Sequence, residues 1–226
     1  MIFRRAMVCV GLVLAGCAIG PDVRPATVPA PGGGEGVVEL PDILPEGVHE
    51  GGFVVSVGDG EGEPAAYSLR PVPSEPGRWR LEIEGWRVSE LTRAQDGSVL
   101  VVRNVDVRER VAVDYDPPIL LVPSAMAAGL PLEGSSRMRV LDAESGAERD
   151  AGDCRWRIEL VEPAGADGVF ELRTTLRIEL RLAVADVGIE SSYQAGRGLA
   201  GERVDRRTRA LGLFPMNLLQ HYERID

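Results

Sequence analysis

The chain has 226 residues, with 25 basic residues that are all Arg, 35 acidic residues and a formal net charge of −10. A net negative charge argues against a nucleic-acid partner, because nucleic-acid binding depends on Lys and Arg side chains that contact phosphate. It also argues against extended electrostatic binding to anionic lipid. The length fits one folded domain with an extension.

The N-terminus has the pattern of a cleavable targeting segment. Arg4 and Arg5 precede an uncharged apolar run, residues 6–14. This run is too short for a membrane-spanning helix, which needs about 20 apolar residues, but it fits the apolar region of a signal peptide. An ordinary signal peptide is one interpretation, and the residues that follow favour a more specific one.

The run ends in Leu14-Ala15-Gly16-Cys17, which resembles the bacterial lipoprotein signal. In that signal, small residues precede a Cys that is acylated and becomes the mature N-terminus. The resemblance implies a signal peptide over residues 1–16, lipidation of Cys17 and attachment to a membrane through the acyl chains. Ala18 follows the Cys, which by the same resemblance implies the outer membrane, facing the periplasm.

Cleavage at this site would remove two Arg and no acid, so the net charge would move from −10 to −12. Cys9 would leave with the signal peptide and Cys17 would be acylated. Cys154 would then be alone, so no disulfide could form within the mature chain. It alternates with apolar residues, which predicts a buried strand position rather than a reactive thiol.

Residues 17–50 are rich in Pro and Gly and show no regular hydrophobic period. This composition is typical of a flexible tether between the acylated Cys17 and a folded domain. Residues 37–44 can alternatively dock on the domain as a short edge strand. We place the single β domain at residues 51–226.

From residue 51 onward, short runs alternate apolar and polar residues, and Gly, Pro or Asp-Gly turns separate them. Pro117 and Pro118 exclude a central strand at that point, because Pro cannot donate to a ladder. Residues 125–128 suggest one helical turn. The expected strands centre on residues 53–57, 65–72, 79–83, 99–102, 107–113, 138–141, 155–162 and 187–193, and residues 214–222 can form either a last strand or a short helix.

The clearest alternation runs over residues 170–184, which we predict to be one long, bent strand. One face is apolar and the other is mostly charged. A β-strand separates such residues onto two faces, whereas a helix would scatter them. The apolar face is the candidate ligand-binding surface, with residues Phe170, Leu172, Leu176, Ile178 and Leu180.

About ten short strands without a convincing helix predict an all-β fold. The preferred architecture is a single antiparallel, strongly curved sheet, as a half-barrel or open barrel, and the alternative is a β-sandwich. Residues 115–123, 129–134 and 192–199 resemble a pattern of uncharacterised periplasmic β-rich lipoproteins, whose sheets are similar to the half-barrels of lipoprotein carriers. The resemblance implies a concave apolar face and no known enzyme activity.

The sequence shows no catalytic or cofactor-binding motif. With only two His residues, His49 and His221, we expect no metal site. The acidic turn at residues 58–64 lacks the spaced ligands of a calcium loop. Four arginines form either an anion-binding patch or cross-strand pairs with Glu171 and Glu179; they are Arg203, Arg206, Arg207 and Arg209.

These features predict a non-catalytic protein without a cofactor, anchored in the bacterial cell envelope. We expect its β domain to bind a lipid or another apolar small molecule. The alternative is a structural or protein-interaction module of the envelope. An enzyme would need a cleft with clustered titratable groups, and the sequence offers few.

Overall fold

The computed structural model describes residues 36–127, 129–210 and 214–225. The described residues contain strands, turns and loops but no helix, so the all-β prediction is confirmed. The strands are β1 (Val37–Glu39), β2 (His49–Val57), β3 (Glu63–Pro71), β4 (Arg78–Ile83), β5 (Arg87–Arg93), β6 (Val99–Asp106), β7 (Val111–Val122), β8 (Ala125–Ala127), β9 (Leu132–Asp142), β10 (Glu148–Glu162), β11 (Val169–Leu180), β12 (Ala183–Gln194), β13 (Gly198–Ala210) and β14 (Phe214–Ile225).

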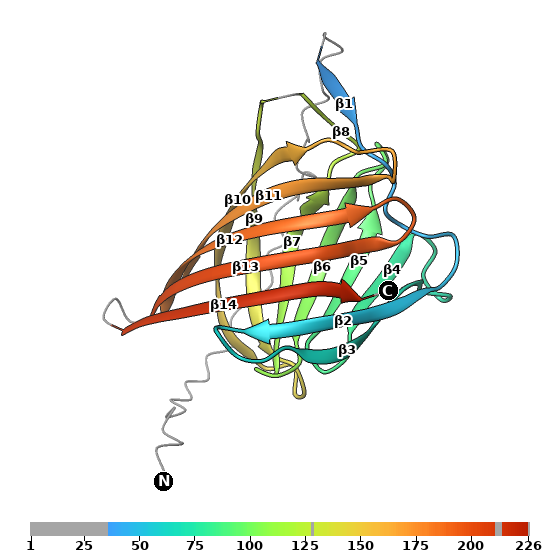
Figure 1. Cartoon of the computed structure of the whole chain (residues 1–226). Helices are drawn as coiled ribbons and strands as arrows, with labels where there is room; N and C mark the ends of the chain where they lie inside the picture. The colour runs from blue at the N-terminus through green and yellow to red at the C-terminus, as the bar shows by residue number, and fades with distance from the viewer. Residues whose placement is uncertain (1–35, 128, 211–213, 226) are drawn as a thin grey trace.

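Twelve of the strands form a closed antiparallel barrel in the order β10-β11-β12-β13-β14-β2-β3-β4-β5-β6-β7-β9. Neighbours in the chain are neighbours in the barrel, except that β14 pairs with β2 and β7 pairs with β9. In Figure 1, β10–β14 cross the front of the barrel, and β4–β7 with β9 form the wall behind them. β1 and β8 make a separate two-stranded sheet.

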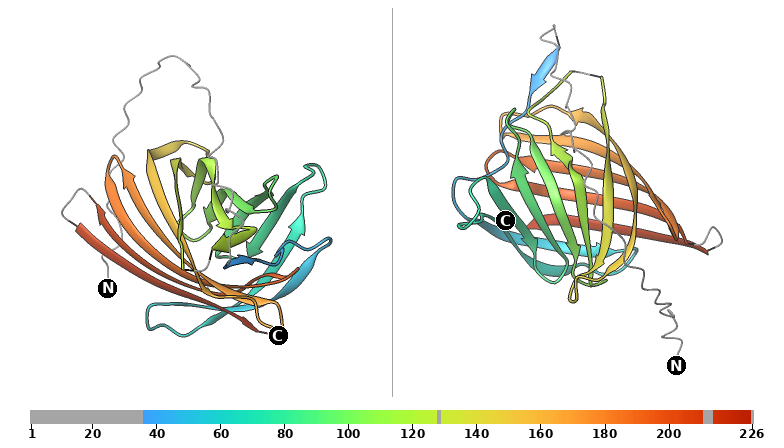
Figure 2. Two further views of the ribbon diagram at one scale, coloured as in Figure 1. Left: turned by 90° about the horizontal axis from the view of Figure 1, so that it is seen from above. Right: turned by 180° about the vertical axis from the view of Figure 1, so that it is seen from behind.

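The prediction of a half-barrel or open barrel is wrong, because the barrel is closed. The prediction of a single curved antiparallel sheet is confirmed. The last strand meets the first along six residue pairs, from Gln220↔Val57 to Ile225↔Gly52. This pairing removes both free sheet edges, whose unpaired backbone groups would otherwise be open to other chains. Figure 2 shows the wall curving around the interior.

The single strand predicted over residues 170–184 is instead a tight hairpin of β11 and β12, which turns at Arg181 and Leu182. No Gly, Asn or Pro marks the turn. Asp150 of β10 holds it from outside the hairpin: its carboxylate accepts the backbone N–H groups of Arg181 and Leu182, at 3.3 and 3.2 Å. The residue that determines this turn therefore lies 31 residues before it in the chain.

Pro117 and Pro118 lie within β7, a central strand of the barrel, so the prediction that they exclude such a strand is wrong. The two Pro residues lack the backbone N–H groups that a ladder needs, and the ladder is interrupted where they lie. β6 pairs with β7 up to Asp114 and again from Ile119, and β9 pairs with it as far as Asp116. Residues 125–127 likewise form β8 and not the predicted helical turn.

Residues 40–48, which we call the plug segment, close one end of the barrel. Leu40, Ile43 and Leu44 are buried and belong to the main hydrophobic core. Hydrogen bonds to its backbone carbonyls fix the segment: the Gly196 N–H donates to the Asp42 carbonyl at 2.9 Å, and the Trp79 indole N–H donates to the Pro45 carbonyl at 3.2 Å.

The expected boundary between tether and domain at residue 51 is therefore too late. The fold begins at β1, which pairs with β8 beside the plugged end. The alternative docking of residues 37–44 matches this arrangement. Hydrophobic alternation could not predict the plug segment, because its buried residues belong to a loop and do not recur with a period of two. The signal peptide, residues 1–16, and Cys17 lie outside the described residues.

The two faces of the barrel wall differ in chemistry. Inward positions carry the apolar core, which is one continuous cluster. Many outward positions carry exposed Arg, Asp and Glu in ladders of ion pairs. Among the described residues, none forms a helix long and apolar enough to cross a membrane.

Candidate functional site

The candidate ligand face of β11 points into the barrel along its whole length, but its two halves have different surroundings. Phe170 and Leu172, near the plugged end, are fully buried. Phe170 packs on Tyr193 with ring centroids 5.7 Å apart. These two residues are part of a filled core, so they offer a ligand no accessible surface.

Leu176, Ile178 and Leu180 lie nearer the opposite end, which we call the open end. They pack against the core but are only partly buried. Val204 of β13 and Leu218 of β14 also face inward here and are half-buried. The open end therefore has a partly accessible apolar wall to which β11, β13 and β14 contribute.

Between the two ends, an ion pair crosses the barrel interior. The Arg87 guanidinium on β5 donates to the carboxylate of Glu202 on β13, and four strands separate the two in the barrel. Glu202 is only 6% exposed. Ser191 Oγ donates to its other oxygen at 3.3 Å, and the Arg87 guanidinium lies 5.1 Å from the ring centroid of Tyr222.

The electrostatics keep the Arg87 guanidinium charged. Burial alone lowers the pKa of Arg87, but the adjacent Glu202 carboxylate and Tyr222 outweigh it and raise this pKa. Arg87 Nε is buried and has no hydrogen-bond partner among the described residues. The nearby tyrosines stay neutral, because burial raises the pKa of Tyr67 to about 12 and also raises that of Tyr193.

The four predicted arginines of β13 separate onto two faces. Arg203, Arg207 and Arg209 face outward and are exposed, whereas Arg206 faces inward and is half-buried. The predicted pairs with Glu171 and Glu179 do not form, because β13 lies between β12 and β14 and does not touch β11.

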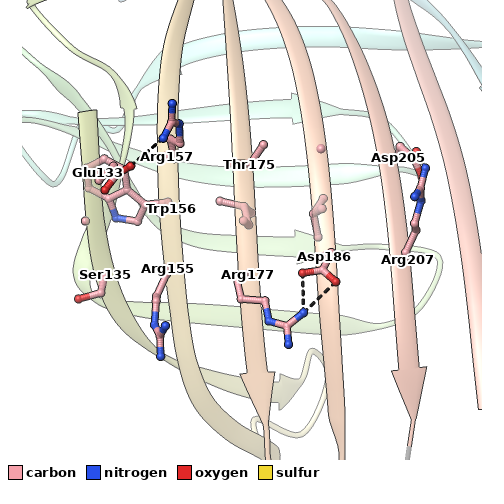
Figure 3. A pocket seen from close by; sticks show the side chains of 14 residues that line it. Glu133, Ser135, Arg155, Trp156, Arg157, Thr175, Arg177, Asp186, Asp205 and Arg207 are labelled. Carbon is pink, nitrogen blue, oxygen red and sulfur yellow. Dashed lines mark hydrogen bonds and ion pairs between the residues drawn. The ribbon is translucent and has the colours of Figure 1, made fainter. Parts of the chain in front are cut away.

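A hollow of about 830 Å³ lies on the outer wall over β9–β13 (Figure 3). Gly188 has no side chain to fill its middle. The charged residues that line it pair with one another: Arg157 with Glu133 at 3.0 Å, and Arg177 with Asp186 at 2.7 Å. All four side chains are exposed, so water can replace any of these contacts at little cost.

Nothing in the described part of the chain brings together three potential metal ligands. Cys154 is fully buried on an inward position of β10, and burial raises its pKa to about 11, which leaves the thiol protonated and unreactive. His49 accepts a hydrogen bond from Arg224 at 2.6 Å, and burial together with that cation lowers its pKa.

Sequence reasoning missed Arg87 and Glu202. Each is a charged residue at an inward position of a strand that alternates apolar and polar residues. That position is the only feature of the sequence that could have identified them. Their pairing joins residues 115 positions apart and depends on barrel closure.

Comparisons with models of known protein families, with curated proteins and with solved structures found no match to this chain.

Proposed function

We propose that this protein is a lipid-anchored component of the bacterial cell envelope whose barrel binds an apolar ligand at its open end. In this proposal Cys17 carries the acyl anchor, the outer membrane holds the protein facing the periplasm, and the barrel has no catalytic role. The ligand is a lipid or another apolar small molecule, and no metal or cofactor takes part.

The observation that carries the proposal is the half-buried state of Leu176, Ile178 and Leu180. Inward positions of a filled barrel are buried, as at Phe170 and Leu172. Partly exposed apolar side chains on the same face offer area that a ligand can cover, which is worth about 25 cal/mol per Å².

The rim of the open end supports this interpretation. Large apolar side chains are exposed at the ends or turns of several hairpins there, namely Val57, Val107, Leu182 and Met216. An apolar ligand entering at this end would meet exposed apolar side chains at the rim and partly buried ones on the inner wall. A structural or interaction role is the second candidate, because the same exposed rim can bury against a partner protein.

Binding is tested with oleyl alcohol, an uncharged long-chain probe, by native mass spectrometry on the full chain carrying Cys17→Ser. We expect a one-to-one complex, and we expect Ile178→Asn to weaken it at least about tenfold by placing an amide on the apolar wall. Thr175→Asn is the matched control, since Thr175 lies on the same strand but faces outward. Equal effects of the two substitutions, or no complex with the parent chain, would favour the interaction role.

The anchor is tested separately. Cys17→Ser removes the only thiol that the lipoprotein pattern can acylate, so we expect the protein to move from the membrane fraction to the periplasmic extract. Fractionation of the native host measures this. If the Ser variant stays with the membrane, acylation of Cys17 is not what holds the protein there.

A further inference from the structure

Arg206 occupies an unusual position on the inner wall of the open end. Inward residues of β13 alternate as Glu202, Val204 and Arg206, and the first of these is buried. In the ladder Arg206 lies opposite Val187 of β12 and Leu218 of β14. Val187 in turn lies opposite Leu176, and Leu176 opposite Trp156. A single guanidinium therefore interrupts a rung of apolar side chains.

Arg206 makes no hydrogen bond or ion pair with any residue that the structure describes. Three acids on this side of the barrel already have partners. Asp150 holds Arg181 at 3.0 Å, and Asp142 holds Arg149 at 2.5 Å and caps its own turn. Glu202 lies two inward positions deeper and is taken by Arg87.

A half-buried cation on an apolar wall loses part of its hydration and gains nothing in return unless an anion meets it. The guanidinium is planar and its donors suit a carboxylate in a two-point contact. An amphiphile with an anionic head would satisfy the cation and the apolar wall at once.

We propose that Arg206 binds the carboxylate of a long-chain amphiphile whose hydrocarbon tail covers Leu176, Ile178 and Leu180. This inference rests on the proposed apolar-ligand function and adds the charge of the ligand. Arg87 is the weaker candidate for the head group, because Glu202 already neutralises it.

The test compares oleate with oleyl alcohol, which differ in the charged head and share the tail. Affinities are measured by native mass spectrometry and by titration calorimetry on the full chain with Cys17→Ser. We expect oleate to bind at least about tenfold more tightly than the alcohol, as a charge-assisted hydrogen bond to a partly buried partner provides. Arg206→Gln should remove this preference and leave alcohol binding within about twofold.

Two further variants make the result specific. Arg203→Gln removes an outward Arg of the same strand and should leave oleate binding unchanged. Arg206→Lys keeps the charge and should retain part of the preference, with oleate affinity falling as ionic strength rises. Thermal midpoints of all variants establish that they fold.

The outcomes separate the two proposals. If the alcohol and oleate bind equally to the parent chain, or if Arg206→Gln leaves oleate binding unchanged, the role of Arg206 is overturned and the apolar site stands. If neither probe binds the folded parent chain, the proposed function is wrong, and the role of Arg206 that depends on it is wrong as well.

Discussion

Replacing Glu202 with Leu is expected to lower the free energy of unfolding by about 3–5 kcal/mol, because it leaves the Arg87 guanidinium inside the barrel without its counter-ion. The carboxylate is 6% exposed, so water cannot replace it. Ser191 loses its acceptor as well. Equilibrium unfolding in urea, with the slope checked for two-state behaviour, measures the loss.

The double variant Arg87→Met with Glu202→Leu should recover most of the stability, since a well-packed apolar pair can replace a buried ion pair at little or no cost. Glu190→Leu is the matched control. Glu190 pairs with Arg173 at 3.1 Å on the outer wall, where it is exposed, and its loss should cost no more than about 1 kcal/mol. Equal losses for Glu202→Leu and Glu190→Leu would show that the interior pair is solvated.

Replacing Ile43 with Asp is expected to be comparably damaging. Ile43 belongs to the plug segment, is 1% exposed and packs in the hydrophobic core. A carboxylate there must either pull the segment out of the barrel end or stay buried without a partner, at a cost of about 3 kcal/mol or more. Denaturant titration and the thermal midpoint should both report the loss.

Val48→Asp supplies the comparison within the same segment. Val48 is 62% exposed, so its substitution should change the free energy of unfolding by no more than about 0.5 kcal/mol. If Ile43→Asp were as mild as Val48→Asp, residues 40–48 would not be docked in solution, and the flexible tether would extend to residue 48 after all.

Local patterns in the sequence predict the strands well, because each strand has one face on the core and one in water. Residues 155–162 and 187–193 alternate in this way and lie in β10 and β12. The sequence-based predictions fail where a residue far away in the chain determines the local structure. Asp150 makes the Arg181–Leu182 turn, and the pairing of β14 with β2 closes the barrel.

The same limit applies to the site. Alternation identifies Phe170, Leu176 and Ile178 as one face, but it carries no information on depth along the barrel. Phe170 became core because the plug segment and Tyr193 cover that end. Arg206 could be found only by counting from a buried neighbour, because four arginines within seven residues suggest a solvated surface.

The pairing of β14 with β2 also sets the order of events during folding. The hairpins from β2 to β7 and from β9 to β14 pair strands that follow one another in the chain, so each can form as its two strands become available. Closure joins residues near 55 to residues near 222 and carries the entropy of a long loop, so we expect it to be a late and slow step. Until β14 is in place, β2 and β13 both present unpaired edges, and the incomplete barrel is then most exposed to aggregation.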